Sequence, residues 1–162
     1  MTNEADAQLL EGGCACGAIR YRLTSGPMFV HCCHCTSCQT ETGSAFVLNA
    51  LIEPDRVQLL AGAPEAVNTP SESGKGQIVF RCPTCRVALW SNYGGAGDRI
   101  RFVRVGTLDE PGELPPDVHI YTRSKLPWVS LPEAVPAVEA YYSSAELWPA
   151  ESLERRDRAL TR

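Results

Sequence analysis

Seven of the eight cysteines stand in three short groups whose spacing is typical of metal ligands: "GGCACGAI", "CHCTSC" and "RCPTCRVAL". Side chains two positions apart in an extended segment point the same way, so Cys-x-Cys presents two sulfur atoms together. Cys-x-x-Cys does the same across a tight turn, and zinc prefers such ligands in a tetrahedron. Isolated cysteines are often small core residues, but that reading does not explain seven at ligand spacing. The pattern therefore predicts zinc binding.

The seven cysteines divide most simply into a group of four and a group of three. The first and third groups together fill a closed structural zinc site, which would clip a long loop: Cys14, Cys16, Cys82 and Cys85. The middle group leaves a fourth position open, as catalytic zinc sites do: Cys33, Cys35 and Cys38. Joining the first group to the middle one is the alternative, but five ligands exceed a tetrahedron and strand the third group. We expect two zinc ions per chain.

The residues around the middle group have less specific roles. His31 shares the side of Cys33 and is a possible fourth ligand, although three thiolates already suffice for binding. Cys32 and His34 point to the opposite side, so we expect them to pack or to support the ligands. His119, in "DVHIYT", is expected to be a hydrogen-bonded core histidine.

The elements that carry these residues read mainly as short β-strands. Six β-branched or aromatic runs are separated by glycine and proline: residues 18–23, 44–51, 57–62, 77–81, 99–108 and 117–122. Partial alternation in "RIRFVRVG" indicates a strand with one buried face. After Trp128 only 132–147 and 151–162 have helical character, and the last dozen residues are expected to be a frayed or exposed tail. We expect a zinc domain over 10–130 and a C-terminal extension over 131–162.

Length and composition bound the class of protein. The chain has 162 residues, a net charge of −4 and a pI near 5.4, so it has no basic field for nucleic acid. No apolar stretch is long enough to span a bilayer, and "MTNEADAQLL" does not read as a targeting segment. We expect a cytoplasmic protein, and in that reducing compartment clustered cysteines indicate metal ligation or catalysis rather than disulfides.

Four motifs, in their order and separation, resemble the glutathione-dependent formaldehyde-activating enzyme family, which shares its domain with centromere protein V. They are "GGCACGAI", "CHCTSCQTETGSAF", "FRCPTCRVALW" and "HIYTRSKLPW", and the resemblance covers about residues 10 to 130. It implies a zinc-containing, mainly β fold called a β-tent, also seen in a Rab nucleotide-release chaperone and in methionine-R-sulfoxide reductases. It also implies the same division into a structural and a catalytic zinc site.

Two positions depart from the family pattern. Arg86 stands where the family usually has glycine, which argues against a positive φ at that position. Cys32 adds a thiol beside the middle group that the family does not require, and we expect an inert packed thiol there. Gly43, in "TETGSAF", is expected to serve a turn rather than a phosphate site.

The ligand set favours chemistry on a thiol. Zinc with three thiolates carries a formal charge of −1 and acidifies water less than zinc with three histidines, so hydrolysis is not the first expectation. The resemblance implies that glutathione is the thiol and that it adds to formaldehyde, giving S-hydroxymethylglutathione, in a carbon–sulfur lyase reaction or its reverse. Cations that could hold the glutathione carboxylates are Arg20, Arg81, Arg101, Arg104, Arg123 and Lys125. Lys125 and Trp128 fall within the family motif "SKLPW" and are candidates to line the pocket.

Two other functions remain open at this point. A thiol or sulfoxide reductase would use Cys32 as its nucleophile, but such a protein of this fold would need two Cys-x-x-Cys pairs around one zinc. A non-catalytic binding module would use both zinc ions only to hold its surface together. An open three-cysteine site is unnecessary for that role.

Overall fold

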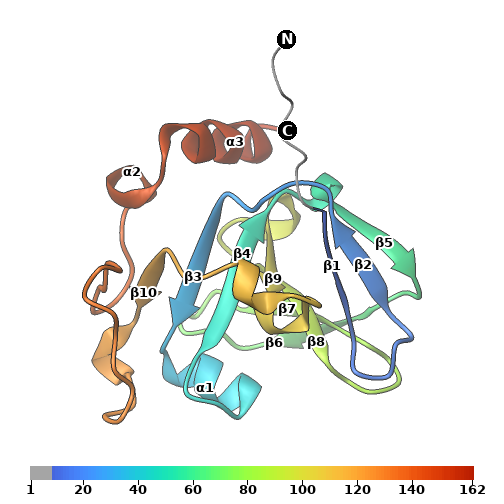
Figure 1. Ribbon diagram of the computed structural model, residues 1–162, viewed down its shortest axis with the longest axis horizontal. Coiled ribbons are helices and arrows are strands. Elements are labelled where there is room, and N and C mark those ends of the chain that lie inside the picture. The colour runs from blue at the N-terminus through green and yellow to red at the C-terminus, as the bar shows by residue number, and fades with distance from the viewer. Residues whose placement is uncertain (1–8) are drawn as a thin grey trace.

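Two sheets of short strands form most of the computed structural model, which describes residues 9–162 (Figure 1). Residues 1–8, which belong to the stretch expected to lack a targeting segment, lie outside the described residues. The strands are β1 (Leu10–Gly13), β2 (Arg20–Leu23), β3 (Phe29–Cys33), β4 (Val47–Ile52), β5 (Val57–Ala61), β6 (Glu65–Thr69), β7 (Gln77–Arg81), β8 (Ala88–Tyr93), β9 (Arg101–Arg104) and β10 (Val118–Ile120). The helices are α1 (Thr36–Thr42), α2 (Ser144–Leu147) and α3 (Ala150–Leu160), with several single 3-10 turns between strands.

The smaller sheet has the order β1-β2-β5 and the larger one β10-β3-β4-β9-β8-β7-β6. All strand pairs are antiparallel except β10 and β3, which run parallel with His119 opposite Cys32. The expected mainly β class, with short strands and a helical C-terminal extension, is confirmed. Because β3 lies between β10 and β4, the middle cysteine group begins inside the larger sheet.

Each of the six predicted runs contains a strand, and four further strands were not predicted. The missed strands are β1, β3, β6 and β8. The sequences of β1, "LEGG", and β6, "EAVNT", contain few residues with high strand propensity. The strand β3, "FVHCC", was read only as part of the cysteine group, although all five of its residues are buried.

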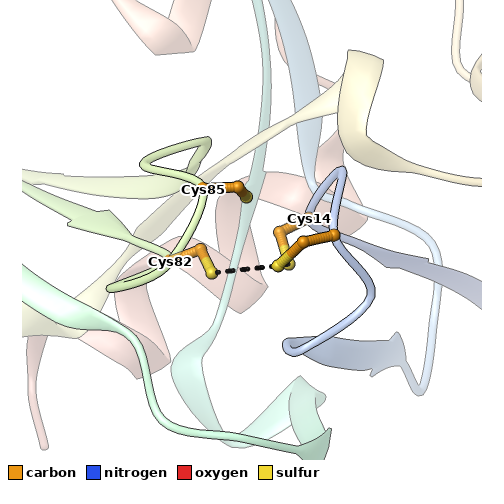
Figure 2. Close-up of side chains that lie close together, drawn as sticks. Cys14, Cys82 and Cys85 are labelled. Atoms are coloured by element: carbon orange, nitrogen blue, oxygen red, sulfur yellow. Dashed lines mark hydrogen bonds between the residues drawn. The ribbon is translucent and has the colours of Figure 1, made fainter.

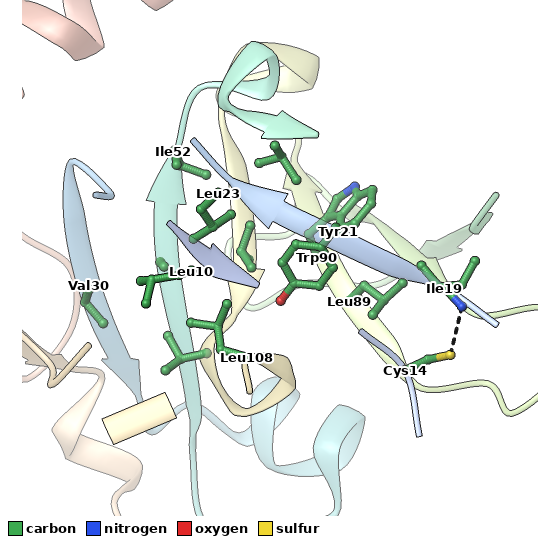
Figure 3. Close-up of a cluster of buried hydrophobic side chains, with 14 of the residues drawn as sticks. Leu10, Cys14, Ile19, Tyr21, Leu23, Val30, Ile52, Leu89, Trp90 and Leu108 are labelled. Carbon is green, nitrogen blue, oxygen red and sulfur yellow. Dashed lines mark hydrogen bonds between the residues drawn. The ribbon is translucent and has the colours of Figure 1, made fainter. Parts of the chain in front are cut away.

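A first hydrophobic core lies where the two sheets pack together, and Figure 3 shows it. Tyr21 from β2 meets Trp90 from β8 edge to face, with ring centroids 5.8 Å apart. The Tyr21 hydroxyl pairs with Thr107 Oγ1 at 2.7 Å, so the phenol is buried without losing its hydrogen bond. Cys14 and Cys82 belong to this core. The core therefore fixes the positions of two of the cysteines.

A second core joins the larger sheet to the C-terminal extension. Alternate residues of β3 serve the two cores: Val30 belongs to the first, and Phe29 and Cys33 belong to the second. Phe29 stacks on Trp148 with centroids 5.2 Å apart. The extension is thus part of the packing around the middle cysteine group.

The last dozen residues, expected to be a frayed or exposed tail, instead form most of helix α3, which packs against the second core. Residues 136–140 run beside β10, where the His119 amide donates to the Pro136 carbonyl at 2.8 Å and the Tyr121 amide donates to Ala140 at 2.9 Å. The helix α3 then lies over the beginning of β3 and the end of β4, as Figure 1 shows, and the Ser152 hydroxyl donates to the Met28 carbonyl at 2.6 Å. None of the helices within residues 9–162 has the length and apolar character needed to cross a membrane.

A buried ion pair anchors α3, and breaking it is expected to destabilise the protein by about 3 kcal/mol. Arg155 donates to both oxygens of Glu53, at 2.8 and 2.6 Å, and both residues are buried. Burial alone would raise the pKa of the Glu53 carboxyl, but the hydrogen bonds from Arg155 hold it below its ordinary value. The stabilisation is therefore complete above the ordinary carboxyl pKa and is lost as the pH falls through the lowered one.

Urea unfolding of Arg155→Ala against wild type measures this effect. The difference between the two proteins should be largest near neutral pH and should shrink in acid. Arg158→Ala, which changes an exposed arginine of the same helix, is the matched control and should unfold close to wild type. An Arg155→Ala protein as stable as this control would contradict the assignment.

Candidate functional site

The first and third cysteine groups meet at one end of the first core. Cys14 and Cys16 lie in the turn after β1, and Cys82 and Cys85 lie in the turn after β7. Their sulfur atoms all lie within 4.8 Å of one another. Figure 2 shows Cys82 and Cys85 on one loop, facing Cys14 on the other. The two loops are brought together although they stand far apart in the sequence.

The spacing of these sulfur atoms suits a tetrahedral metal ion. Zn–S bonds of about 2.3 Å place neighbouring sulfurs of a tetrahedron about 3.8 Å apart. Here the Cys14 and Cys16 sulfurs are 3.5 Å apart, and those of Cys16 and Cys82 are 3.7 Å apart. The Ile19 amide also donates to the Cys14 sulfur at 3.2 Å, a contact that favours a thiolate. The four residues therefore fit zinc, although their ligation stays a prediction.

The third group keeps a strained turn without glycine. Arg86 has a φ of 66°. The expectation that this position lacks a positive φ is therefore wrong. The Arg86 amide donates to the Cys82 carbonyl at 3.0 Å, which closes the turn that carries both cysteines. A left-handed conformation costs a non-glycine residue about 1–2 kcal/mol. The surrounding turn supplies the stabilisation that holds it.

The middle group is built where β3 ends and α1 begins. Cys33 is the last residue of β3, Cys35 is the N-cap of α1, and Cys38 lies in its first turn. The Cys35 sulfur accepts from the Cys38 amide at 3.3 Å, so a cysteine takes the place of the usual capping residue. Gly43 ends the helix with a φ of 64°, in agreement with the turn expected there. All three sulfur atoms lie within 4.8 Å of one another.

Burial makes this group a candidate for a cation. Cys33, Cys35 and Cys38 are each at most 5% exposed. Hydrogen bonds from Cys35 and Cys38 raise the pKa of Cys33, whereas hydrogen bonds from Cys33 and Cys38 lower the pKa of Cys35 to about 3. Deprotonating three adjacent thiols in a buried space requires a nearby positive charge. A soft divalent ion such as zinc fits this set.

Cys32, His34 and His119 form a separate buried cluster, as the alternation along the chain predicts. His34 Nε2 and His119 Nδ1 are 3.0 Å apart, and the Cys32 sulfur lies 3.5 Å from His34 Nε2. Burial raises the pKa of Cys32 to about 12, so its thiol stays protonated. His119 is a buried, hydrogen-bonded histidine, as expected.

His31 is held by the C-terminal extension rather than placed among the three sulfurs. Its Nε2 lies 2.6 Å from the Tyr142 hydroxyl, which also accepts from Trp148 Nε1 at 2.7 Å. Burial lowers the pKa of His31 to about 3, so the ring is neutral. The position of His31 therefore does not support a role as the fourth zinc ligand.

A pocket of about 580 Å³ opens beside the middle group, and Cys33, Cys35 and Cys38 are among its lining residues. Much of the remaining lining is aromatic, from the larger sheet and the C-terminal extension: Tyr93, Phe102, Tyr121, Tyr141, Tyr142 and Trp148. Tyr121 adopts a left-handed φ of 54°, and such strain at a pocket is typical of functional positions. The three sulfurs are thus reachable from a cavity large enough for an organic substrate.

The cations proposed from the sequence are used elsewhere. Arg81 and Arg104 both pair with Glu41, and Arg20 pairs with Asp109 at 2.5 Å. The remaining three make other contacts within the protein: Arg101 over Trp90, Arg123 with Glu72, and Lys125 with the carbonyls of Leu126 and Val129.

Among residues 9–162, the lysine and arginine that line the pocket are Lys75 and Arg156, which the sequence analysis missed. Lys75 precedes β7 and Arg156 lies on α3. Lys125 and Trp128 do not line the pocket, and Trp128 is 74% exposed. No sequence signal marked Lys75 or Arg156, because both reach the pocket through long-range folding.

Comparison with known proteins places most of the chain within one family. A family model described as "Glutathione-dependent formaldehyde-activating enzyme" matches residues 9–124. A Halomonas elongata protein named "Putative glutathione-dependent formaldehyde-activating enzyme" is 27% identical over 129 residues, which cover 76% of this chain and 81% of that protein. A Rhodobacter sphaeroides protein of known crystal structure is 17% identical with a TM-score of 0.46, covering 79% of this chain and 99% of that one.

Proposed function

We propose, because the chain belongs to the glutathione-dependent formaldehyde-activating enzyme family, that it is a zinc-dependent carbon–sulfur lyase. It would form or cleave S-hydroxymethylglutathione or a related thiol adduct. In this proposal two zinc ions bind per chain, one at Cys14, Cys16, Cys82 and Cys85 and one at Cys33, Cys35 and Cys38. The observation that carries the proposal is the pocket that reaches three adjacent buried sulfur atoms.

The two cysteine groups have different surroundings, which supports different roles. The group of four offers as many sulfur atoms as a tetrahedral zinc site needs, and none of its cysteines lines the pocket of about 580 Å³. The group of three leaves one position of a tetrahedron free and faces that pocket. A zinc ion in this second site supplies a Lewis acid that lowers the pKa of an incoming thiol and orients its sulfur.

The chain's own residues bind and orient the two reactants. Lys75 and Arg156 line the pocket and would pair with the two carboxylates of glutathione, Arg156 in exchange for its contact with Asp157. Ile100 and Ile120 add buried apolar surface to the same pocket. Holding a thiol next to a carbonyl converts a bimolecular addition into an effectively unimolecular step. The new bond joins sulfur to the carbonyl carbon, and the thiol proton ends on the carbonyl oxygen.

The alternatives receive less support. A reductase needs an accessible nucleophile, but Cys32 is 2% exposed, does not line the pocket and has a raised pKa. A non-catalytic binding module does not account for a pocket that is lined by three thiols. A cytoplasmic location is part of the proposal, because clustered cysteines in that reducing compartment bind metals rather than form disulfides.

Exchange NMR on mixed glutathione and formaldehyde tests the proposal, because the adduct also forms without an enzyme. The zinc-loaded protein at micromolar concentration is expected to increase the interconversion rate at least about tenfold over the uncatalysed rate. Protein treated with a chelator is the control and should return the rate to background. An unchanged exchange rate with fully loaded protein would favour the binding module instead.

A further inference from the structure

The pocket contains an aromatic wall that is larger than the formaldehyde adduct of glutathione requires. We define this wall as Tyr121, Tyr141, Tyr142 and Trp148, all of which line the pocket. Formaldehyde has no substituent on its carbonyl carbon, and glutathione carries amides, carboxylates and an ammonium group but no ring. Aromatic side chains in a pocket favour apolar or aromatic ligand groups. The wall therefore indicates a substrate group that the family name does not include.

Most of the wall comes from the chain outside the segment that matches the family. That match ends at residue 124, whereas Tyr141, Tyr142 and Trp148 all lie beyond it. The extension brings these rings over β3, next to Phe29 and His31. The shape of this side of the pocket is thus a property of the C-terminal extension of this chain.

The wall is built rigidly and still leaves one ring face available. Tyr142 is fixed between His31 and Trp148 by the two hydrogen bonds described above, and Trp148 is 7% exposed. Tyr141 stacks on Tyr142 with centroids 5.2 Å apart and an interplanar angle of 21°. Tyr141 nevertheless remains 55% exposed while it lines the pocket. An aromatic surface fixed in this way is prepared for a ligand at little cost in ordering.

The same pocket offers both cations and an aromatic surface. Lys75 and Arg156 suit the carboxylates of the thiol, as proposed above. The aromatic wall is then left for the substituent of the carbonyl compound. We propose that the carbonyl substrate is an aldehyde with an aromatic or bulky apolar substituent, which the wall recognises. This inference rests on the proposed lyase function and names the substrate class of the same site.

The proposed reaction forms and breaks the same bonds as the reaction with formaldehyde. The sulfur of the thiol forms a bond to the aldehyde carbon, the carbonyl π bond opens, and the thiol proton ends on the oxygen. The product is a hemithioacetal, and no oxidant or reductant is needed. Only the group attached to the carbonyl carbon differs.

Two stable thioethers measure the recognition without any reaction. S-(3-phenylpropyl)glutathione imitates the adduct of an aldehyde with an aromatic substituent, and S-methylglutathione imitates the formaldehyde adduct. Calorimetry with the zinc-loaded full chain should give at least about tenfold tighter binding of the first compound, because a phenyl group is buried. Tyr141→Ala should reduce this ratio severalfold. Trp128→Ala, which removes an exposed ring outside the pocket, should leave the ratio unchanged.

Exchange NMR with glutathione and either 3-phenylpropanal or formaldehyde separates this inference from the proposed function. We expect larger acceleration for 3-phenylpropanal. Acceleration confined to formaldehyde, or equal binding of the two thioethers, would overturn the inference and leave the lyase function standing. A binding ratio that Tyr141→Ala does not change would also overturn it. No acceleration with either aldehyde would refute the lyase function and this inference together.

Discussion

Cys38→Ser is expected to lose one of two zinc ions per chain and to lower the glutathione–formaldehyde exchange to the uncatalysed rate. Cys38 is one of only three sulfurs at the proposed catalytic site, and a serine hydroxyl is a poor replacement for a soft thiolate ligand. With two ligands remaining, the site cannot hold the ion that positions the thiol. Native mass spectrometry counts the ions, and exchange NMR measures the rate on the same preparation.

Cys32→Ser is the matched control for this prediction. Cys32 is equally buried and stands next to Cys33, but its sulfur belongs to the separate cluster with His34 and His119. This variant should keep both zinc ions and the exchange rate. Two ions bound to Cys38→Ser would refute the three-cysteine site. If Cys32→Ser keeps both ions but loses the exchange activity, the result would favour a reactive role for Cys32, as in the reductase alternative.

Cys82→Ser is expected to weaken binding of the other zinc ion, which would keep three cysteines, and to reduce the free energy of unfolding by up to about 4 kcal/mol. Cys16 and Cys82 stand 66 positions apart, and closing a loop of that length removes about this much conformational free energy from the unfolded chain in the loop-entropy model. Cys82 is also fully buried within the first core, so its ligand position cannot be taken by water. A loss of this size is a large part of the stability of an ordinary domain.

Urea unfolding with and without a chelator tests the structural role. Wild-type protein should lose stability when the chelator is added. Cys82→Ser should lose little more, because the zinc site that joins its two loops is already disrupted. Cys38→Ser should fall less than Cys82→Ser, since its three ligands come from one short stretch of chain. A Cys82→Ser protein within about 1 kcal/mol of wild type would show that the four cysteines do not clip the fold.

Local spacing in the sequence is enough to predict the parts of this protein that depend on short-range geometry. Alternation along an extended segment separates Cys33 and Cys35 from Cys32 and His34, and the structure keeps those two sets apart. The six predicted runs became strands for the same reason, since propensity and periodicity act over a few residues. Zinc ligation itself, and the number of ions, stays a prediction from these spacings.

Long-range packing explains what the sequence could not predict. Arg81 and Arg104 looked available for a carboxylate until the fold placed both against Glu41. Lys75 and Arg156 reach the pocket only because the loop before β7 and the docked helix α3 meet beside the middle cysteine group. The C-terminal residues read as a charged tail, since the surface that buries Ser152 and Arg155 is formed by segments more than 100 positions earlier. Ligand spacing is a property of neighbours in the chain, whereas the composition of a pocket depends on contacts between distant segments that only the folded chain brings together.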